Sequence, residues 1–292
     1  PIRNWKMALN RFMIEFEDKV IPLDDWITQF IDWLVEGYRW FFQLIKWPVE
    51  MTLSGLENGL LAIHPLIIIA FVGLIAWRVS GKKLAVFSIA TLVFIGLLGF
   101  WEDTMITLAM VFSSVVFCTI AGIPLGICAG RSDRFEAILR PVLDGMQTTP
   151  AFVYLVPIVM LFSIGNVAGV LATIVFALPP IIRLTALGIR QVHPELVEAA
   201  LAFGATKRQV LMKVQIPLAM PTIMAGLNQT IMMALSMVVI AALIGAGGLG
   251  APVVLGLNTL DIGLATIGGL SIVLIAIILD RITQSLGKKN KS

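Results

Sequence analysis

An uncharged stretch of 25 residues decides the fold of this chain, and it reads Met105-Ile-Thr-Leu-Ala-Met-Val-Phe-Ser-Ser-Val-Val-Phe-Cys-Thr-Ile-Ala-Gly-Ile-Pro-Leu-Gly-Ile-Cys-Ala129. A helix that crosses a lipid bilayer needs about 17–25 predominantly apolar residues. Glu102 and Asp103 precede the stretch, and Arg131 follows it. The stretch is therefore predicted to be a membrane-spanning helix with one acidic and one basic end.

The composition of the whole chain agrees with a membrane protein. Of the 292 residues, 58% are hydrophobic and 13% are charged, and the mean hydropathy is +0.95. Soluble domains carry about 25% charged residues, and no soluble fold hides so much apolar surface. These values exclude an ordinary cytosolic enzyme, a nucleic-acid-binding domain and a disordered chain.

Apolar runs recur on both sides of this stretch, which is the third of seven. The runs are Pro65–Trp77, Leu84–Trp101, Met105–Ala129, Pro141–Phe162, Val167–Ile182, Leu218–Ile244 and Ile262–Leu279. The fourth run contains Pro150 and Pro157, and the fifth ends in Pro179-Pro180. Because unpaired backbone groups are costly in lipid, we expect these breaks to be buried in protein or to line a cavity. The runs predict an all-α integral membrane protein with about seven transmembrane helices.

Basic residues alternate along the connections between the runs. The first, third and fifth connections and the C-terminal tail carry fifteen Lys and Arg residues, whereas the second, fourth and sixth connections carry none. Basic residues collect on the cytoplasmic side of membrane proteins. We therefore expect the amino terminus outside and the carboxyl terminus in the cytoplasm.

Apolar side chains recur at helical spacing between Pro22 and Pro48, ahead of the first run. Pro22 suits the start of a helix and Pro48 suits its end. The opposite face of this helix is polar and mostly acidic. Such an amphipathic helix can lie in a membrane interface or pack on a neighbouring protein surface, and the sequence leaves both alternatives open.

The chain offers no recognisable catalytic chemistry. It has no G-x-x-x-x-G-K-[ST] phosphate loop and no convincing Ser/His/Asp or Cys/His set. Cys118 and Cys128 fall in apolar stretches, which favours buried free thiols. His64 and His193 cannot build a multi-His metal centre. We expect no enzyme, no metal site and no cofactor bound by this chain.

The middles of the apolar runs are almost empty of ionisable side chains, since Asp144, Arg183 and Asp280 lie near the ends of runs. Proton-driven transporters usually keep such groups at mid-membrane. The energy for any transport should therefore come from outside this chain. Sodium binding by backbone carbonyls at broken helices remains an alternative.

Small residues four apart lie along the last part of the third run, at Gly122, Gly126 and Gly130. Such spacing lets two helix backbones approach closely. It predicts a helix-packing face, with a functional hinge as the alternative.

The largest inner connection reads Arg190-Gln-Val-His-Pro-Glu-Leu-Val-Glu-Ala-Ala-Leu-Ala-Phe-Gly-Ala-Thr-Lys-Arg-Gln-Val-Leu-Met-Lys-Val-Gln-Ile-Pro217. Pro194 suits the first turn of a helix, and Gly204 is a natural carboxyl cap. Thr206 suits the start of a second helix that continues into the sixth run. The segment is predicted to be a protruding helix–glycine–helix knob, which physics alone also allows to be a cover over the helix bundle.

The spacing of Glu198-Ala-Ala, Gly204 and Val214-Gln-Ile-Pro217 resembles the EAA loop of ABC importer permeases, with Val214 and Ile216 as conservative replacements. The resemblance covers Thr104 to Thr283 and implies a five-helix type I importer core. Residues 144–157, 176–183, 234–240 and 22–26 resemble more narrowly the glycine betaine/proline betaine importer permeases. The implied domains are an outer segment (1–63), two accessory spans (64–103), the core (104–283) with its coupling loop (190–217), and a cytoplasmic basic tail (284–292).

The resemblance implies a permease subunit, and not an enzyme, of an ATP-driven importer for betaine-like compatible solutes. It implies the cytoplasmic (inner) membrane of a bacterium or archaeon. The implied partners are a second copy of the chain, two cytoplasmic ATPase subunits that hold ATP and Mg²⁺, membrane lipid, and no nucleic acid. A substrate-binding protein is expected as a separate chain, since the sequence ends soon after its last run. A permease for another small solute and an ion-coupled secondary transporter remain alternatives.

Two groups of site residues follow from the resemblance. The ATPase-coupling residues are His193, Pro194, Glu195, Glu198, Ala199, Ala200, Gly204, Ala205 and Pro217. The candidates for the substrate path are Thr148, Thr149, Pro150 and Phe152 at the break of the fourth run, and Asn228, Gln229 and Ser236 in the sixth. Hydrogen bonding between helices is the alternative role for these path residues.

Overall fold

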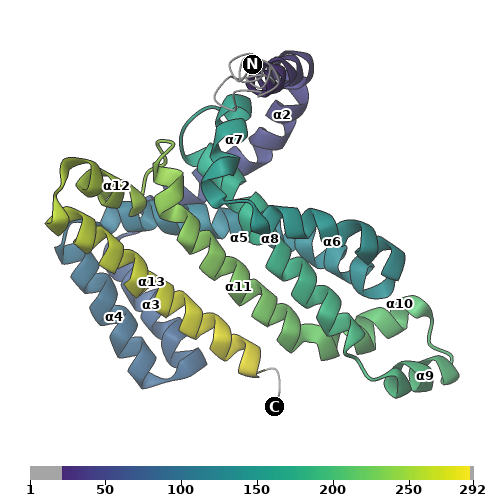
Figure 1. Ribbon diagram of the computed structural model, residues 1–292. Coiled ribbons are helices and arrows are strands. Elements are labelled where there is room, and N and C mark those ends of the chain that lie inside the picture. The colour runs from purple at the N-terminus through teal and green to yellow at the C-terminus, as the bar shows by residue number, and fades with distance from the viewer. Residues whose placement is uncertain (1–21, 290–292) are drawn as a thin grey trace, which may run out of the picture. The chain divides into compact units, whose positions relative to one another are not determined.

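A computed structural model describes residues 22–289, and these residues form helices and no strands (Figure 1). The helices are α2 (Leu23–Ala62), α3 (Pro65–Ser80), α4 (Lys82–Leu97), α5 (Trp101–Arg131), α6 (Asp133–Thr148), η1 (Ala151–Tyr154), α7 (Leu155–Phe162), α8 (Asn166–Arg190), α9 (Pro194–Ala202), α10 (Lys207–Val210), η2 (Leu211–Gln215), α11 (Ile216–Ala242), α12 (Gly250–Thr259) and α13 (Ile262–Lys289). Residues 1–21 of the expected outer segment and 290–292 of the tail lie outside the described residues. The chain divides into two units, before and after the Phe41–Phe42 bond.

The first unit contains the amino-terminal part of α2. Trp26, Phe30 and Trp33 expose more than half of their side-chain surface there, and the rings of Phe30 and Trp33 lie 6.0 Å apart. Tyr38 interrupts the helix with φ −122° and ψ 21°. Both proposed surroundings of this amphipathic segment, lipid interface and protein surface, would cover such an apolar face.

The expectation that this helix ends at Pro48 is wrong, because α2 continues to Ala62. Pro48 cannot donate a backbone hydrogen bond. Its own carbonyl accepts from Thr52 Oγ1 at 2.8 Å, and the next turn carries Val49 and Leu53, which are 3% and 2% exposed. Burial of these side chains in the second unit offsets the missing backbone bond.

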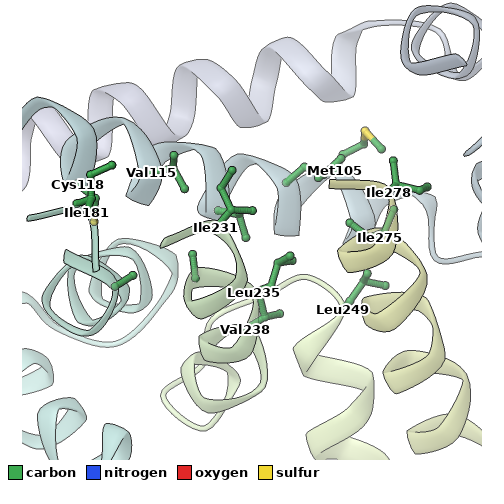
Figure 2. Packing of buried hydrophobic residues seen from close by; sticks show 14 of the residues in the cluster. Met105, Val115, Cys118, Ile181, Ile231, Leu235, Val238, Leu249, Ile275 and Ile278 are labelled. Carbon is green, nitrogen blue, oxygen red and sulfur yellow. The ribbon is translucent and has the colours of Figure 1, made fainter. Parts of the chain in front are cut away.

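The core of the second unit lies where α5, α8 and α11 pack together, with α13 beside α11 (Figure 2). Its labelled members are Met105, Val115, Cys118, Ile181, Ile231, Leu235, Val238, Leu249, Ile275 and Ile278. A Cβ atom on Gly126 would lie 2.7 Å from the carbonyl oxygen of Ile182, and one on Gly130 would lie 3.0 Å from that of Ala186. The glycine stripe is therefore a helix-packing face, as predicted.

Four helices of the described chain are long and apolar enough to cross a membrane: Trp101–Arg131, Asn166–Arg190, Lys207–Ala242 and Ile262–Gly287. The number rises to six if two bent pairs each count as one span, namely Asp25–Ala62 with Pro65–Ser80 and Asp133–Thr148 with Ala151–Phe162. An all-helical, multi-pass membrane protein is confirmed. The number seven and the accessory status of the first two spans stay predictions.

Two local expectations need correction. The helix break expected at Pro179-Pro180 is absent, because α8 continues through both prolines to Arg190, although the prolines are buried in protein as expected. Neighbouring helices enclose this region, and Thr230 of α11 donates a hydrogen bond to the carbonyl of Ala177 at 3.1 Å. Protein contacts of this kind make proline tolerable within a membrane helix.

The second correction concerns the cysteines, of which Cys118 is buried and Cys128 is exposed. Cys128 follows Gly126 by two residues, so the two lie on nearly opposite sides of α5. Gly126 contacts α8, and this leaves Cys128 on the face that α8 does not cover. Cys128 is therefore an exposed free thiol and not the buried one that the sequence predicted.

Candidate functional site

The predicted helix–glycine–helix order of the coupling loop is confirmed in its first half. Pro194 opens α9, and the helix closes at Phe203, whose N–H donates to Ala199 O at 3.0 Å. Gly204 follows with φ +81°, and the N–H of Ala205 donates back to Ala200 O at 3.1 Å. A left-handed residue after the last turn is how helices commonly end, and glycine adopts it without a Cβ clash.

The second half of the loop is helical and continues without a break into the sixth apolar run. Thr206 Oγ1 accepts from the Gln209 N–H at 3.3 Å, and Gln209 Oε1 accepts from the Thr206 N–H at 2.8 Å. This reciprocal capping box starts α10. A π-helical turn, Leu211–Gln215, joins α10 to α11, which has Pro217 in its first turn. The knob is thus anchored on α11.

The coupling loop projects beyond the ends of α8 and α11 (Figure 1), and α9 contains no buried residue. Among the expected coupling residues, Ala200 and Ala205 are half-buried, and the others are exposed: His193, Pro194, Glu195, Glu198, Ala199, Gly204 and Pro217. Sequence reasoning did not select Phe203, which is 94% exposed. The sequence signal that could have indicated Phe203 is its place as a large apolar residue directly before the capping Gly204. Leu196, seven residues earlier and so on the same side, is 45% exposed. Exposed apolar patches, rather than single residues, mark partner-binding surfaces.

A hollow of about 380 Å³ separates the two halves of the knob, and it is lined by Ala200, Phe203, Gly204, Gln209 and Lys213 among others. The loop therefore offers an apolar tip beside a concave, partly basic surface. Among the described residues, no group of three or more His, Cys, Asp or Glu side chains could hold a metal ion. The arrangement is suited to docking rather than to bond-making chemistry.

The break in the fourth run lies between α6 and η1. Thr149 and Pro150 are extended, with ψ of 128° and 135°, and the helices on either side are bent by 103°. Thr149 Oγ1 donates to Gly145 O at 2.8 Å, and Tyr154 Oη donates to Met146 O at 2.5 Å. Phe152 is 61% exposed. The predicted break is real, and these two hydroxyl groups satisfy part of the freed backbone.

Two of the polar residues of α11, Asn228 and Gln229, lie beside α13 and the cavity there. Asn228 Nδ2 donates to Asp280 Oδ1 of α13 at 3.0 Å, and Thr283 Oγ1 donates to Asn228 Oδ1. Gln229 lines, with Asn228, a cavity of about 410 Å³ between α8, α11 and α13. Ser236 Oγ bonds its own helix, at Met233 O. A role in the substrate path stays a prediction for all of these residues.

The family model described as the binding-protein-dependent transport system inner membrane component matches residues 122–292. This region contains the coupling loop, the break and α11. The chain belongs to this family. The expected membrane location and the resemblance on the EAA spacing are thereby confirmed at the level of the family.

Named relatives agree with this family assignment. This chain is 56% identical over 277 residues to the glycine betaine/proline betaine transport system permease protein ProW of Escherichia coli (strain K12). The match covers 95% of this chain and 78% of ProW. The chain is 46% identical over 82% of its length, and 85% of the relative, to the glycine betaine transport system permease protein OpuAB of Bacillus subtilis (strain 168).

A solved structure supports the same fold for the permease. A chain of the MetNI methionine ABC transporter, in an inward-facing conformation, superimposes with a TM-score of 0.53 at 27% identity, covering 63% of this permease and 90% of that chain. The core expected from the sequence thus has the fold of an ABC importer permease.

Proposed function

We propose that the chain is the membrane subunit of an ATP-driven importer of glycine betaine, proline betaine and similar compatible solutes. The observation that carries the proposal is the coupling loop, an exposed knob with Phe203 at its tip in a chain that is otherwise strongly apolar. Identity to the glycine betaine/proline betaine permease over 95% of the chain supports this choice of substrate.

The ATP and Mg²⁺ belong to a separate ATPase in this proposal. Residues 193–205 dock on that subunit from the cytoplasmic side, and the chain itself breaks no bond. One chain carries one coupling loop, so a working transporter needs two copies and two ATPase subunits. A separate substrate-binding protein delivers the solute on the outer side.

The proposed topology follows the basic residues. The amino terminus is outside, α3 and α4 are the two accessory spans, residues 104–283 form the core, and the carboxyl terminus is cytoplasmic. Seven spans result when the bent pair Asp133–Thr148 and Ala151–Phe162 counts as one broken span. Lysine and arginine on alternate connections support this orientation.

The proposed mechanism is alternating access. A loaded binding protein docks outside, and ATP draws the two ATPase subunits and the paired coupling loops together, which opens the path outward. Hydrolysis then returns the path to the inward state. The break at Thr149-Pro150 and the α11 residues Asn228, Gln229 and Ser236 are the candidates for lining the path.

Reconstitution tests the proposal. The chain is placed in proteoliposomes with the ATPase and binding protein of its own transport system, and uptake of radiolabelled glycine betaine is measured with ATP at the face that carries the ATPase. We expect uptake to require all three proteins and ATP, and proline betaine to compete. Accumulation by this chain alone, driven by a proton or sodium gradient, would contradict the proposal.

A further inference from the structure

Two arginines of α8 hold the amphipathic helix α6 alongside it. Arg190, the last residue of α8, contacts the first turn of α6, with Nη1 2.8 Å from Asp133 Oδ1 and Nη2 2.7 Å from Glu136 Oε2. The same Nη2 donates to Ala129 O, near the end of α5, at 2.9 Å. One guanidinium therefore joins three helices directly before the coupling loop begins.

The other end of α6 is held in the same way. Arg183 Nη2 lies 2.6 Å from Asp144 Oδ1, and Arg183 Nη1 donates to Gln147 Oε1 at 2.5 Å. Arg183 and Arg190 are seven residues apart and so share one face of α8. The amino-terminal acids of α6 pair with the later arginine and its carboxyl end with the earlier one, so the two helices are antiparallel.

These polar contacts join α6 to α8 at both ends of α6. Leu143 is the one buried residue of α6, and a cavity of about 340 Å³, lined by Leu139, Arg140 and Leu187 among others, lies between the helices. Charge-assisted hydrogen bonds from a guanidinium are the stronger and more directional kind. The contacts therefore tie both ends of α6 to α8.

We infer that Arg183 and Arg190 are positioning residues that make α6 and α8 one rigid body, which carries movement of the coupling loop to the break at Thr149-Pro150. The loop starts directly after Arg190, and the break starts directly after Gln147-Thr148, so the two arginines lie at the two ends of α6, one beside the loop and one beside the break. The inference rests on the proposed function, because it assumes that the loop is moved by an ATPase.

The test compares R183Q and R190Q with R134Q in the reconstituted transporter. Arg134 is an exposed residue of α6 that forms no ion pair with any residue between 22 and 289, so its neutralisation is the matched control. Mutations in a coupling network change the coupling severalfold to about thirtyfold. We expect R183Q and R190Q to keep ATPase association and ATP hydrolysis, while glycine betaine transported per ATP falls about tenfold. R134Q should match the unmodified protein.

A charge reversal separates positioning from simple folding. The double variant D144R/R183D restores the ion pair with its signs exchanged, and it should recover most of the transport per ATP that R183D alone loses. Unchanged transport per ATP in R183Q and R190Q would overturn the inference. The inference would also be overturned if D144R/R183D reached the normal amount in the membrane and bound the ATPase normally, but its transport per ATP stayed as low as that of R183D. Failure of the unmodified protein to use ATP would instead contradict the proposed function.

Discussion

Gly204 is a residue at which backbone conformation, and not the space around it, dictates the amino acid. Its φ is +81°, and a Cβ atom placed there would meet nothing within 4 Å. The reason for glycine is therefore not crowding but the left-handed conformation, which costs other residues about 1–2 kcal/mol and β-branched residues more. Asparagine tolerates this conformation better than most residues do.

This contrast gives the first prediction. Gly204→Val should redirect the knob, so ATPase association, uptake and substrate-stimulated ATP hydrolysis should all collapse. Gly204→Asn should keep most of each activity, and insertion should survive in both variants because the spans lie elsewhere. Co-purification of the ATPase and glycine betaine uptake are the measurements. Full association and uptake in Gly204→Val would mean that the loop is only a cover over the bundle.

At the scale of helices, the contact between α5 and α8 depends on Gly126. An added Cβ would lie 2.5 Å from Thr185 Cβ and 2.7 Å from Ile182 O, and the second of these is backbone that cannot turn aside. Gly145 in α6 has nothing within 4 Å of the same position. Alanine at Gly126 therefore tests close helix packing, whereas alanine at Gly145 tests helix propensity alone.

Gly126→Ala should destabilise the protein by about 1–3 kcal/mol, since α5 and α8 must move apart. Gly145→Ala should leave stability unchanged or raise it by less than about 1 kcal/mol, because alanine favours the helix. Thermal unfolding in detergent measures both variants. Equal melting temperatures for the two would contradict the close contact.

Sequence reasoning predicted elements well where a local rule decides. Pro194, Gly204 and Thr206 fix the coupling loop through first-turn, left-handed and capping preferences, and all three lie where expected. It failed at Pro48 and at Pro179-Pro180, where helices continue because burial and neighbouring helices outweigh the missing backbone bonds. The α6 ion pairs were also missed, since they join residues 39 and more positions apart.

The candidate site was predictable in unequal parts. The docking knob depends on one continuous segment, so its residues could be named, apart from Phe203, whose exposure only the fold reveals. The path depends on which helix faces which. Asn228 belongs to a polar contact with Asp280 and Thr283 of α13, and no spacing within α11 predicts that partner.

At the scale of the whole molecule, orientation across the membrane follows from charge. Single cysteines at Lys82 and Glu102, in a background without Cys118 and the exposed Cys128, should react from opposite sides of intact cells. Position 102 should react with an impermeant maleimide added outside, and position 82 only after permeabilisation. The reverse pattern would overturn the proposed topology.

The central claim is that the coupling loop is where the chain meets its ATPase. A photo-crosslinking amino acid at Phe203, which is 94% exposed, tests it directly in membranes that contain the assembled transporter. The matched control position is Leu257, which is 63% exposed and belongs to α12. Helix α12 lies far from α9 within the second unit (Figure 1). We predict a crosslink to the ATPase from position 203 and none from position 257. No ATPase adduct at position 203, or equal adducts at both positions, would contradict the account.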